Sequence, residues 1–325
     1  MSVAPLLKVR DLGVTFRTGD RVTVASTDVS FDLAAGQVLA VVGESGSGKS
    51  VSALALTRLL PPAPTCEVVG TIELAGRALT GLTEAELSKV RGKDIAYIFQ
   101  EPGTSLNPVY TIGFQIGEAI ELHRPDVTDV RAAVLAALRD VHIDDPARVA
   151  DSYPHELSGG MQQRAMIAMA LACDPKILVA DEPTTALDVT VQAQIMELLG
   201  DIRYEFGTAV ILITHDLGVV AGFCDRTLVM YGGQIMEEGV TEELFEKPTH
   251  PYTRGLLSAV PRLDRDDEML ITIAGEPPDM SHLPAGCPFS PRCANVRAEC
   301  AQTRPQLTTM DGRRRACHVP VKEVA

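Results

Sequence analysis

A glycine-rich octapeptide near the start of the chain combines the residue types that bind phosphate groups. Its members, in order, are Gly43, Glu44, Ser45, Gly46, Ser47, Gly48, Lys49 and Ser50. In the pattern G-x-x-x-x-G-K-[ST], the glycines let backbone N–H groups turn towards phosphate oxygens, the lysine adds a positive charge, and the final hydroxyl binds magnesium. We therefore predict a site for a nucleoside triphosphate with Mg²⁺ at this phosphate loop.

Polar side chains also follow two apolar runs in the second half of the chain. Asp181 and Glu182 follow Ile177–Ala180, and His215 comes shortly after Val210–Ile213. Because parallel strands present ligand groups at their carboxyl ends, we expect Asp181 to organise magnesium, Glu182 to accept a proton from an attacking water, and His215 to contact the γ-phosphate. Singly, each has a structural alternative as a helix cap, a surface carboxylate or a hydrogen-bonded histidine. Their combination with the phosphate loop favours a nucleotide site.

The apolar pattern predicts the elements that must position these residues. Val38–Val42 is expected to form a strand before the phosphate loop, with a helix over residues 51–56 after it. Beyond residue 175, continuous apolar runs alternate with helical periodicity, which indicates a parallel sheet covered on both faces. A hairpin over residues 6–33 precedes this core, residues 231–234 form a hairpin turn, and residues 111–172 form an inserted helical block.

Composition and charge narrow the possible classes of protein. The chain has 325 residues, of which 46% are hydrophobic and 22% charged, as in globular proteins. Its net charge of -14 argues against a nucleic-acid-binding surface. No apolar run approaches the roughly 18 residues of a membrane span, and the N-terminus lacks the pattern of a signal peptide. We therefore expect a cytoplasmic location, with any membrane contact made through a partner.

A second motif, Leu157-Ser158-Gly159-Gly160, resembles the signature motif of ATP-binding-cassette (ABC) ATPases. The string alone is weak, because Ser-Gly-Gly commonly begins a helix. Its position adds the specificity: it lies between the phosphate loop and Asp181, with Gln100 upstream and Ala186-Leu187-Asp188 downstream. The resemblance covers residues 6–240.

The resemblance implies roles for these residues. Phe16 would stack on adenine, and Gln100 would reach magnesium and the attacking water. The signature residues would contact a γ-phosphate held by the opposite subunit, and Asp188 would contribute to the dimer interface. Met161 replaces the Gln found in many ABC proteins, but Gln162 follows it. By this resemblance, the residues that bind the nucleotide would be Phe16, the phosphate loop from Gly43 to Ser50, Ser158, Gly159, Gly160, Gln162 and Asp188.

The C-terminal part carries two further resemblances. Lys247–Leu257 looks like the tail of ATPase subunits from oligopeptide and dipeptide importers. Four of the seven cysteines follow, namely Cys287, Cys293, Cys300 and Cys317, and they resemble the cysteine-bearing end of the same group. Four thiolates can hold a [4Fe–4S] cluster or zinc, and the absence of a C-x2-4-C pair favours the cluster. Zinc or idle thiols remain the alternatives, and the other three cysteines are interpreted as buried or idle.

The predicted fold is α/β: a P-loop NTPase core of the ABC type with an antiparallel β subdomain, an inserted helical subdomain and a small C-terminal cysteine-containing appendage. Residues 1–240 would form the nucleotide-binding domain, with the helical subdomain at about 101–172. Residues 241–325 would form the C-terminal extension that carries the cysteine site.

The resemblance implies an ATP-hydrolysing subunit that powers a membrane importer for peptides. Its partners would be a second homologous ABC ATPase, two transmembrane permease subunits, and an extracytoplasmic solute-binding protein. A heterodimer of two different ATPase subunits is favoured over a homodimer. It would lie peripherally on the cytoplasmic side of the inner membrane, with residues 100–108 near the permease. Alternatives are an importer for nickel or glutathione, a soluble ABC ATPase acting on ribosomes or DNA, and a regulatory subunit without turnover. The sequence does not name the cargo.

Overall fold

The computed structural model describes residues 4–185, 187–259, 273–310 and 312–324. It divides into two compact units, and each is described by itself. The first unit contains the described residues of Met1–Leu33, Val38–Thr80 and Ile213–Ala325. The second unit contains Ala34–Gln37 and Gly81–Leu212.

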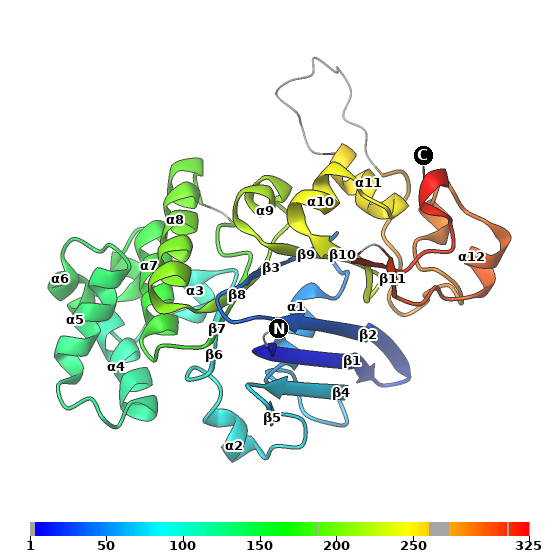
Figure 1. Ribbon diagram of the computed structural model, residues 1–325. Coiled ribbons are helices and arrows are strands. Elements are labelled where there is room, and N and C mark those ends of the chain that lie inside the picture. Colours follow the sequence, from blue (N-terminus) through cyan, green and yellow to red (C-terminus); the bar gives the residue numbers. More distant parts are fainter. Residues whose placement is uncertain (1–3, 186, 260–272, 311, 325) are drawn as a thin grey trace. The chain divides into compact units, whose positions relative to one another are not determined.

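The first unit begins with an antiparallel sheet, whose strands lie side by side in Figure 1. The predicted hairpin over residues 6–33 is confirmed, because β1 (Leu7–Thr18) pairs antiparallel with β2 (Arg21–Leu33). On its other side, β1 pairs with β4 (Cys66–Leu74), which is joined to the short β5 (Arg77–Ala78). β4 begins at Cys66, which pairs with Phe16 of β1.

A second group of strands in this unit carries the phosphate loop. β3 (Val38–Val42) is buried along its whole length, runs parallel to β9 (Arg226–Tyr231), and is followed by α1 (Lys49–Ala55). The predicted turn at residues 231–234 is confirmed by the antiparallel pairing of β9 with β10 (Gln234–Val240).

The C-terminal residues extend this group of strands. β10 pairs antiparallel with β12 (Arg313–Arg315), and β12 pairs in turn with β11 (Thr308–Met310). Within the first unit, the C-terminal region is therefore joined to β10 by a ladder of backbone hydrogen bonds. The helices of this part are α9 (Leu217–Phe223), α10 (Thr241–Glu246), α11 (Pro251–Ser258) and α12 (Ala298–Gln302), with short 3-10 turns at Ser290–Arg292 and Val321–Glu323.

The second unit contains three strands in the order β8-β7-β6 and most of the longer helices. β6 (Ile95–Ile98) pairs parallel with β7 (Ile177–Asp181), next to which lies β8 (Ala209–Ile213), whose last residue is counted with the first unit. Its helices are α2 (Glu84–Ser88), α3 (Pro102–Ser105), α4 (Ile112–His123), α5 (Val130–Asp140), α6 (Pro146–Asp151), α7 (Gly159–Leu171) and α8 (Val189–Phe206), with a 3-10 turn at Pro154–Glu156.

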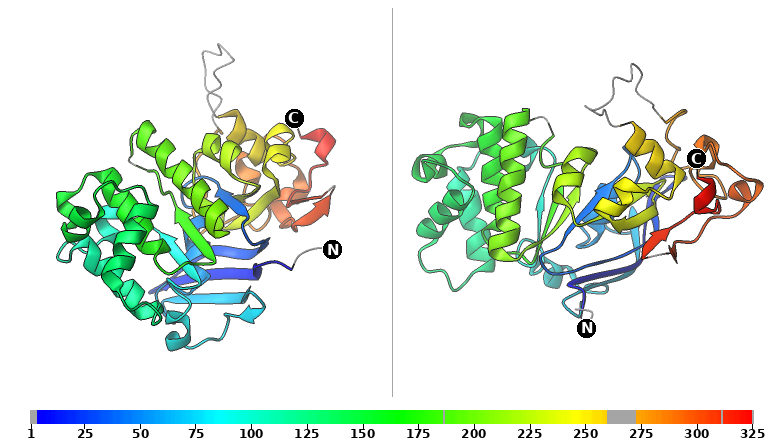
Figure 2. Two further views of the ribbon diagram at one scale, coloured as in Figure 1. Left: turned by 60° about the vertical axis from the view of Figure 1, so that its left-hand side comes forward. Right: turned by 45° about the horizontal axis from the view of Figure 1, so that its top comes forward.

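The helices α4 to α7 pack on one another, and both views of Figure 2 show them as one group. The four-residue spacing of Ile112, Ile116 and Ile120 places all three on the buried side of α4. Each buried isoleucine contributes about 1.5–3 kcal/mol to the stability of this group. Within the described ranges, no helix has the length and apolar character needed to cross a bilayer.

Candidate functional site

The phosphate loop connects β3 to α1 and requires glycine at two points. Gly43 and Gly48 have φ angles of 150° and 94°, which L side chains rarely adopt. A Cβ on Gly43 would lie 2.2 Å from the Met230 carbonyl oxygen, and one on Gly48 would lie 2.4 Å from that of Ala25. The neighbouring strands therefore fix the path of the loop, and only glycine fits these two positions.

The Lys49 side chain lies inside the loop and is only 8% exposed. Its ammonium donates hydrogen bonds to the carbonyl oxygens of Gly43 and Glu44, both at 2.9 Å, and lies 3.4 Å from Ser47 Oγ. A cation removed from water attracts phosphate oxygens more strongly than one on an open surface. The loop thus holds a positive charge at the place where phosphate groups are expected.

The second unit brings Gln100 and Glu182 together. Gln100 Nε2 donates to Glu182 Oε2 at 3.0 Å, and Thr185 Oγ1 donates to the same oxygen at 2.9 Å. Asp181 is the last residue of β7, and Glu182 turns sharply out of the strand with a φ of 47°. Such a conformation is strained for glutamate and is typical of functional positions. The carboxylate is therefore oriented by two donors at the end of a buried strand.

The signature residues lie at the exposed N-terminus of α7. Ser158 caps this helix by accepting a hydrogen bond from the Met161 backbone N–H at 3.4 Å, and both Ser158 and Gly159 are exposed. The first N–H groups of a helix and its dipole attract anions. Gln162 has a different local role, because its amide nitrogen donates to the carbonyls of Pro154 and Leu157 and supports the loop before the helix.

Three other predicted residues lie at or near the ends of elements. Asp188 caps α8 by accepting a hydrogen bond from Val191 N–H at 3.0 Å, so the helix begins at the next residue, Val189. Its neighbour Val189 is 82% exposed. His215 is exposed two residues beyond β8, and Phe16 is half-buried in β1. Ala186 lies outside the described residues.

The predicted site residues fall in both units. The first unit holds Phe16, the phosphate loop, His215 and the four C-terminal cysteines, and the second holds Gln100, Ser158–Gly160, Gln162, Asp181, Glu182 and Asp188. Thr185 was missed in the sequence analysis. Its position three residues after Glu182 was a signal, because a hydroxyl so close along the chain can donate a hydrogen bond to that carboxylate. Tyr252 and Arg292, which contact the phosphate loop at Glu44, were missed as well. No local signal marks them, because they are more than 200 residues away along the chain.

The four C-terminal cysteines lie close enough to influence one another. The pKa of Cys287 is raised to about 12, mainly by burial and to a smaller extent by the neighbouring thiols of Cys317, Cys300 and Cys293. Backbone N–H groups two residues further on donate to three of the sulfurs: Phe289 to Cys287, Asn295 to Cys293, and Val319 to Cys317. Such donors stabilise thiolates and so suit bound metal. However, in the part of the chain that the structure describes, no three His, Cys, Asp or Glu side chains form a group that could hold a metal ion.

The other cysteines are buried. Burial raises the pKa of Cys66 and of Cys173, and the Cys173 thiol lies 3.4 Å from the Ala119 carbonyl oxygen. Cys224 is 8% exposed. A raised pKa disfavours the reactive thiolate. Cys66 and Cys173 therefore behave as packed, unreactive side chains.

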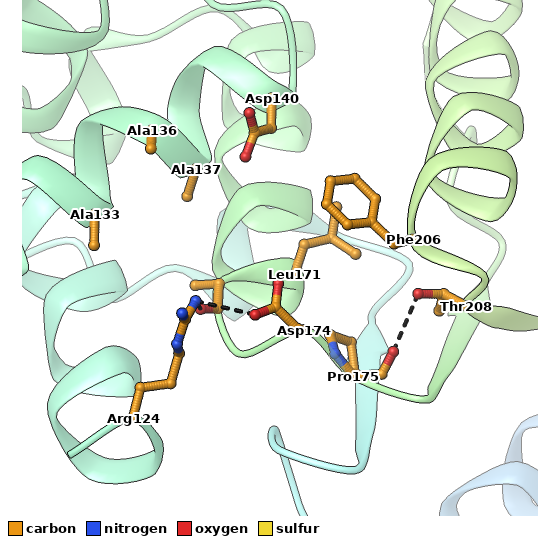
Figure 3. A pocket seen from close by; sticks show the side chains of 11 residues that line it. Arg124, Ala133, Ala136, Ala137, Asp140, Leu171, Asp174, Pro175, Phe206 and Thr208 are labelled. Carbon is orange, nitrogen blue, oxygen red and sulfur yellow. Dashed lines mark hydrogen bonds and ion pairs between the residues drawn. The ribbon is translucent and has the colours of Figure 1, made fainter. Parts of the chain in front are cut away.

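A cavity of about 230 Å³ in the second unit contains none of the predicted site residues. Figure 3 shows it between α5 and the ends of α7 and α8, with Arg124 and Asp174 joined across one side by an ion pair of 3.1 Å. Alanines of α5, Leu171 and Phe206 form its apolar lining. The nucleotide is therefore not assigned to this cavity.

Comparison with known proteins first defines the class. Residues 26–185 match the family model of the ABC transporter, and residues 236–300 match that of the oligopeptide/dipeptide transporter C-terminal region. A solved structure titled as a dimeric post-hydrolysis state of the ATP-binding cassette MJ0796, bound to ADP and Pi, shares 29% identity over 72% of this chain and 98% of its own, with a TM-score of 0.64. The structure of cbiO1 from Clostridium perfringens gives 28% identity over 75% and 92%, with a TM-score of 0.63. These matches confirm the predicted α/β fold of an ABC ATPase.

The particular family follows from two full-length relatives. The oligopeptide transport ATP-binding protein OppD of Haemophilus influenzae is 53% identical over 96% of this chain and 97% of the relative. OppD of Escherichia coli (strain K12) is 50% identical over 98% and 94%. The chain therefore belongs to the ABC transporter ATP-binding proteins, in the group that carries the oligopeptide/dipeptide transporter C-terminal region.

Proposed function

We infer that this chain is the ATP-hydrolysing subunit of a membrane importer for peptides. The observation that carries this conclusion is the co-occurrence, in one chain, of an ATPase site with its carboxylate in place and the C-terminal region of oligopeptide and dipeptide transporters. A regulatory subunit without turnover is disfavoured, because Glu182 is present and held by Gln100 and Thr185. Relatives named as oligopeptide transport ATP-binding proteins support peptides as the cargo class, ahead of nickel or glutathione.

The ABC family implies ATP as substrate and Mg²⁺ as its companion. We assign the phosphate groups to the N–H groups of the loop and to Lys49, and magnesium to Ser50, Gln100 and Asp181, whose oxygens are the ligands that Mg²⁺ prefers. Magnesium would neutralise the charge that develops on the phosphate oxygens. Phe16 would stack on adenine, and His215 would contact the γ-phosphate.

Glu182 is the proposed general base. Its carboxylate removes a proton from water as the water oxygen attacks the γ-phosphorus, the bond to the β-phosphate oxygen breaks, and ADP and phosphate leave. Gln100 and Thr185 orient the carboxylate through their hydrogen bonds to Oε2. The protein thus contributes positioning and charge, which is what phosphoryl transfer demands.

A second ATPase subunit is the proposed partner for the signature residues. Ser158, Gly159 and Gly160 lie at an exposed helix start, where their N–H groups can meet a γ-phosphate held by another chain. Exposed Val189 beside Asp188 supplies apolar area for the same interface. We favour a heterodimer with a homologous ATPase. Residues 1–240 would form the nucleotide-binding domain, with a helical subdomain at about 101–172, and residues 241–325 the extension.

An exposed apolar patch on the second unit supports attachment to a permease. Val109 is 69% exposed, and Tyr110 and Phe114 are 46% and 51% exposed, with their rings stacked 4.6 Å apart at the start of α4. Exposed aromatic clusters mark interaction surfaces. We propose that this patch contacts two transmembrane permease subunits, which act with an extracytoplasmic solute-binding protein. The chain would then lie on the cytoplasmic side of the membrane as a peripheral subunit.

Replacing Phe114 with aspartate is expected to release the chain from its permease. The charge removes an aromatic contact of the kind worth about 2 kcal/mol or more at an interface, so retention should fall at least tenfold. The measurement is the amount of permease that co-purifies with the chain from detergent-solubilised membranes. Leu122→Asp is the matched control, because Leu122 lies on the same helix and is 71% exposed. If the Phe114→Asp variant and the wild type co-purify with equal amounts of permease, the docking surface is refuted. If the wild type co-purifies with ribosomes or DNA in place of permease, the importer function is refuted.

We also propose that the four C-terminal cysteines hold a [4Fe–4S] cluster. The supporting observations are the four thiols within electrostatic reach of one another and the three backbone N–H donors aimed at their sulfurs. The side chains are not gathered into a metal-holding group in the described structure, so loading must bring the thiols together. Its role would be structural, and zinc is the competing occupant.

Purification without oxygen is expected to give a brown protein with about four iron and four sulfide per chain. Cys293→Ser should lose both, because it removes one of four ligands. Cys224→Ser should keep both, since Cys224 lies outside the C-terminal group. Elemental analysis and the visible absorption spectrum make the measurement. Zinc without iron, or no metal at all, would overturn the cluster.

A further inference from the structure

The C-terminal region touches the phosphate loop at Glu44, and the contact is made by Arg292, the residue before Cys293. Arg292 Nη1 donates to Glu44 Oε2 at 2.6 Å, and Nη2 donates to Glu44 Oε1 at 3.0 Å. This is a bidentate pair, the arrangement that gives arginine–carboxylate contacts their strength and fixed geometry. The Arg292 side chain is only 6% exposed, so water screens the pair little.

Every donor of Arg292 is used in this position. Besides the two bonds to Glu44, Nε donates to the Ala274 carbonyl at 2.9 Å, Nη1 to the Tyr231 hydroxyl at 3.2 Å, and Nη2 to the Ile273 carbonyl at 3.2 Å. A guanidinium has five N–H donors, and five hydrogen bonds are formed. Lysine has a single nitrogen and cannot reproduce this arrangement. The hydrogen-bond acceptors around residue 292 therefore match the guanidinium group of arginine.

A second residue of the C-terminal region fixes the backbone at the same point. The Glu44 backbone N–H donates to the Tyr252 hydroxyl at 2.9 Å. Tyr252 is fully buried and packs against Tyr231 and Phe289, with ring centroids 4.6 and 5.2 Å away. Phe289 is two residues after Cys287. The segment between the first two C-terminal cysteines thus supplies Arg292, which pairs with Glu44, and Phe289, which packs against the tyrosine that accepts the Glu44 N–H.

The consequence for the nucleotide site runs through Glu44 to Lys49. Arg292 and Tyr252 hold the side chain and the N–H of Glu44, and the carbonyl of Glu44 accepts a hydrogen bond from Lys49 Nζ. Loss of the contacts with Arg292 and Tyr252 would free Glu44. Its carbonyl, one of those that orient Lys49, would then move. We propose that Arg292 is a positioning residue for ATP binding, which holds the phosphate loop in its binding shape from the cysteine-bearing segment.

This inference rests on the proposed ATP binding, and the experiment separates the two. The dissociation constant of radiolabelled ATP is measured by equilibrium dialysis on the full-length chain without magnesium, where turnover is blocked. The variants are Arg292→Gln, Arg292→Lys, Glu44→Gln and the double variant Glu44→Gln/Arg292→Gln. Arg21→Gln is the matched control, because Arg21 also contacts the C-terminal region, through an exposed 3.5 Å pair with Asp279, but its side-chain hydrogen bonds go to Asp279 and Ser281 and not to Glu44.

Arg292→Gln and Arg292→Lys are each expected to weaken ATP binding roughly tenfold, as loss of a charge-assisted bidentate pair implies. With magnesium, KM should rise by the same factor while kcat at saturating ATP stays within about twofold, because the catalytic carboxylate is untouched. The double variant should be no worse than either single one, since the two residues act as one unit. Arg21→Gln should match wild type.

Unchanged ATP affinity in Arg292→Gln, with a lower melting temperature, would overturn the proposal and leave Arg292 a purely structural residue. Additive losses in the double variant would also overturn it. If Arg292→Gln does not fold, Glu44→Gln makes the same test, because it removes the carboxylate from the other side of the pair. Failure of wild type to bind ATP would instead overturn the proposed function.

Discussion

Replacing Glu182 with glutamine is expected to lower ATP turnover by about 10²–10⁴-fold, the range for loss of a general base. Glutamine has nearly the same shape and can still accept hydrogen bonds from Gln100 and Thr185, but it cannot accept the proton of the attacking water. ATP binding should stay within about threefold of wild type, since the phosphate loop is unchanged. Phosphate release at saturating ATP gives kcat, and equilibrium dialysis gives the dissociation constant.

The matched control for this prediction is Glu205→Gln. Glu205 is an exposed carboxylate near the end of α8, in the same unit as Glu182, and its replacement should leave turnover unchanged. Turnover of Glu182→Gln equal to wild type would refute the assignment of the base. A parallel loss of ATP binding would show that Glu182 acts on the loop or the fold, and it would refute the assignment as well.

Replacing Lys49 with alanine is expected to weaken ATP binding by about 10- to 100-fold, because a hydrogen bond to a charged group contributes about 1.5–3 kcal/mol. The ammonium is held at the centre of the loop by the carbonyls of Gly43 and Glu44, and alanine provides no positive charge there. The measurement is again equilibrium dialysis with ATP. Lys89→Ala is the control, because Lys89 is exposed and lies in the other unit. An ATP affinity of Lys49→Ala within twofold of wild type would contradict the assigned phosphate site.

Both expectations rest on parts of the fold that the sequence specifies locally. β3 is an unbroken apolar run, and it occupies Val38–Val42 as predicted. The glycines that follow have the positive φ values that the tight phosphate loop requires. Likewise, the spacing of the isoleucines in α4 is enough to identify its buried side. Periodicity and turn residues act over a few positions, so they can be read without the structure.

Features that depend on contacts between distant segments could not be predicted from local periodicity and turn residues. The first part of β4 has a mixed pattern and is a strand only because β1 pairs with it. β12 joins the sheet through β10, although about 70 residues lie between them along the chain. The same holds for Arg292, whose five hydrogen bonds come from three separate stretches of sequence. Conversely, spacing along the chain was enough to identify the four C-terminal cysteines as a candidate metal site, namely Cys287, Cys293, Cys300 and Cys317. Spacing does not determine how their side chains are oriented.

The pairing of Gln100 with Glu182 lies between these two cases. Each residue ends or follows a strand that could be predicted, namely β6 and β7, and the two strands are parallel neighbours. Strand ends that share an edge bring their next residues together, so the contact follows from the topology. The positive φ of Glu182 and the hydrogen bond from Thr185 do not follow from topology, and they are what aim the carboxylate.

The most direct test of the central claim is peptide import by the assembled transporter. The chain is purified with its permease and partner ATPase, reconstituted in liposomes with the nucleotide-binding side outward, and supplied with the solute-binding protein and labelled peptide in the lumen. We predict that ATP added outside drives peptide out of the lumen, and that Glu182→Gln slows this movement by at least tenfold. Peptide movement that is independent of ATP, or equal in wild type and Glu182→Gln, would contradict the account.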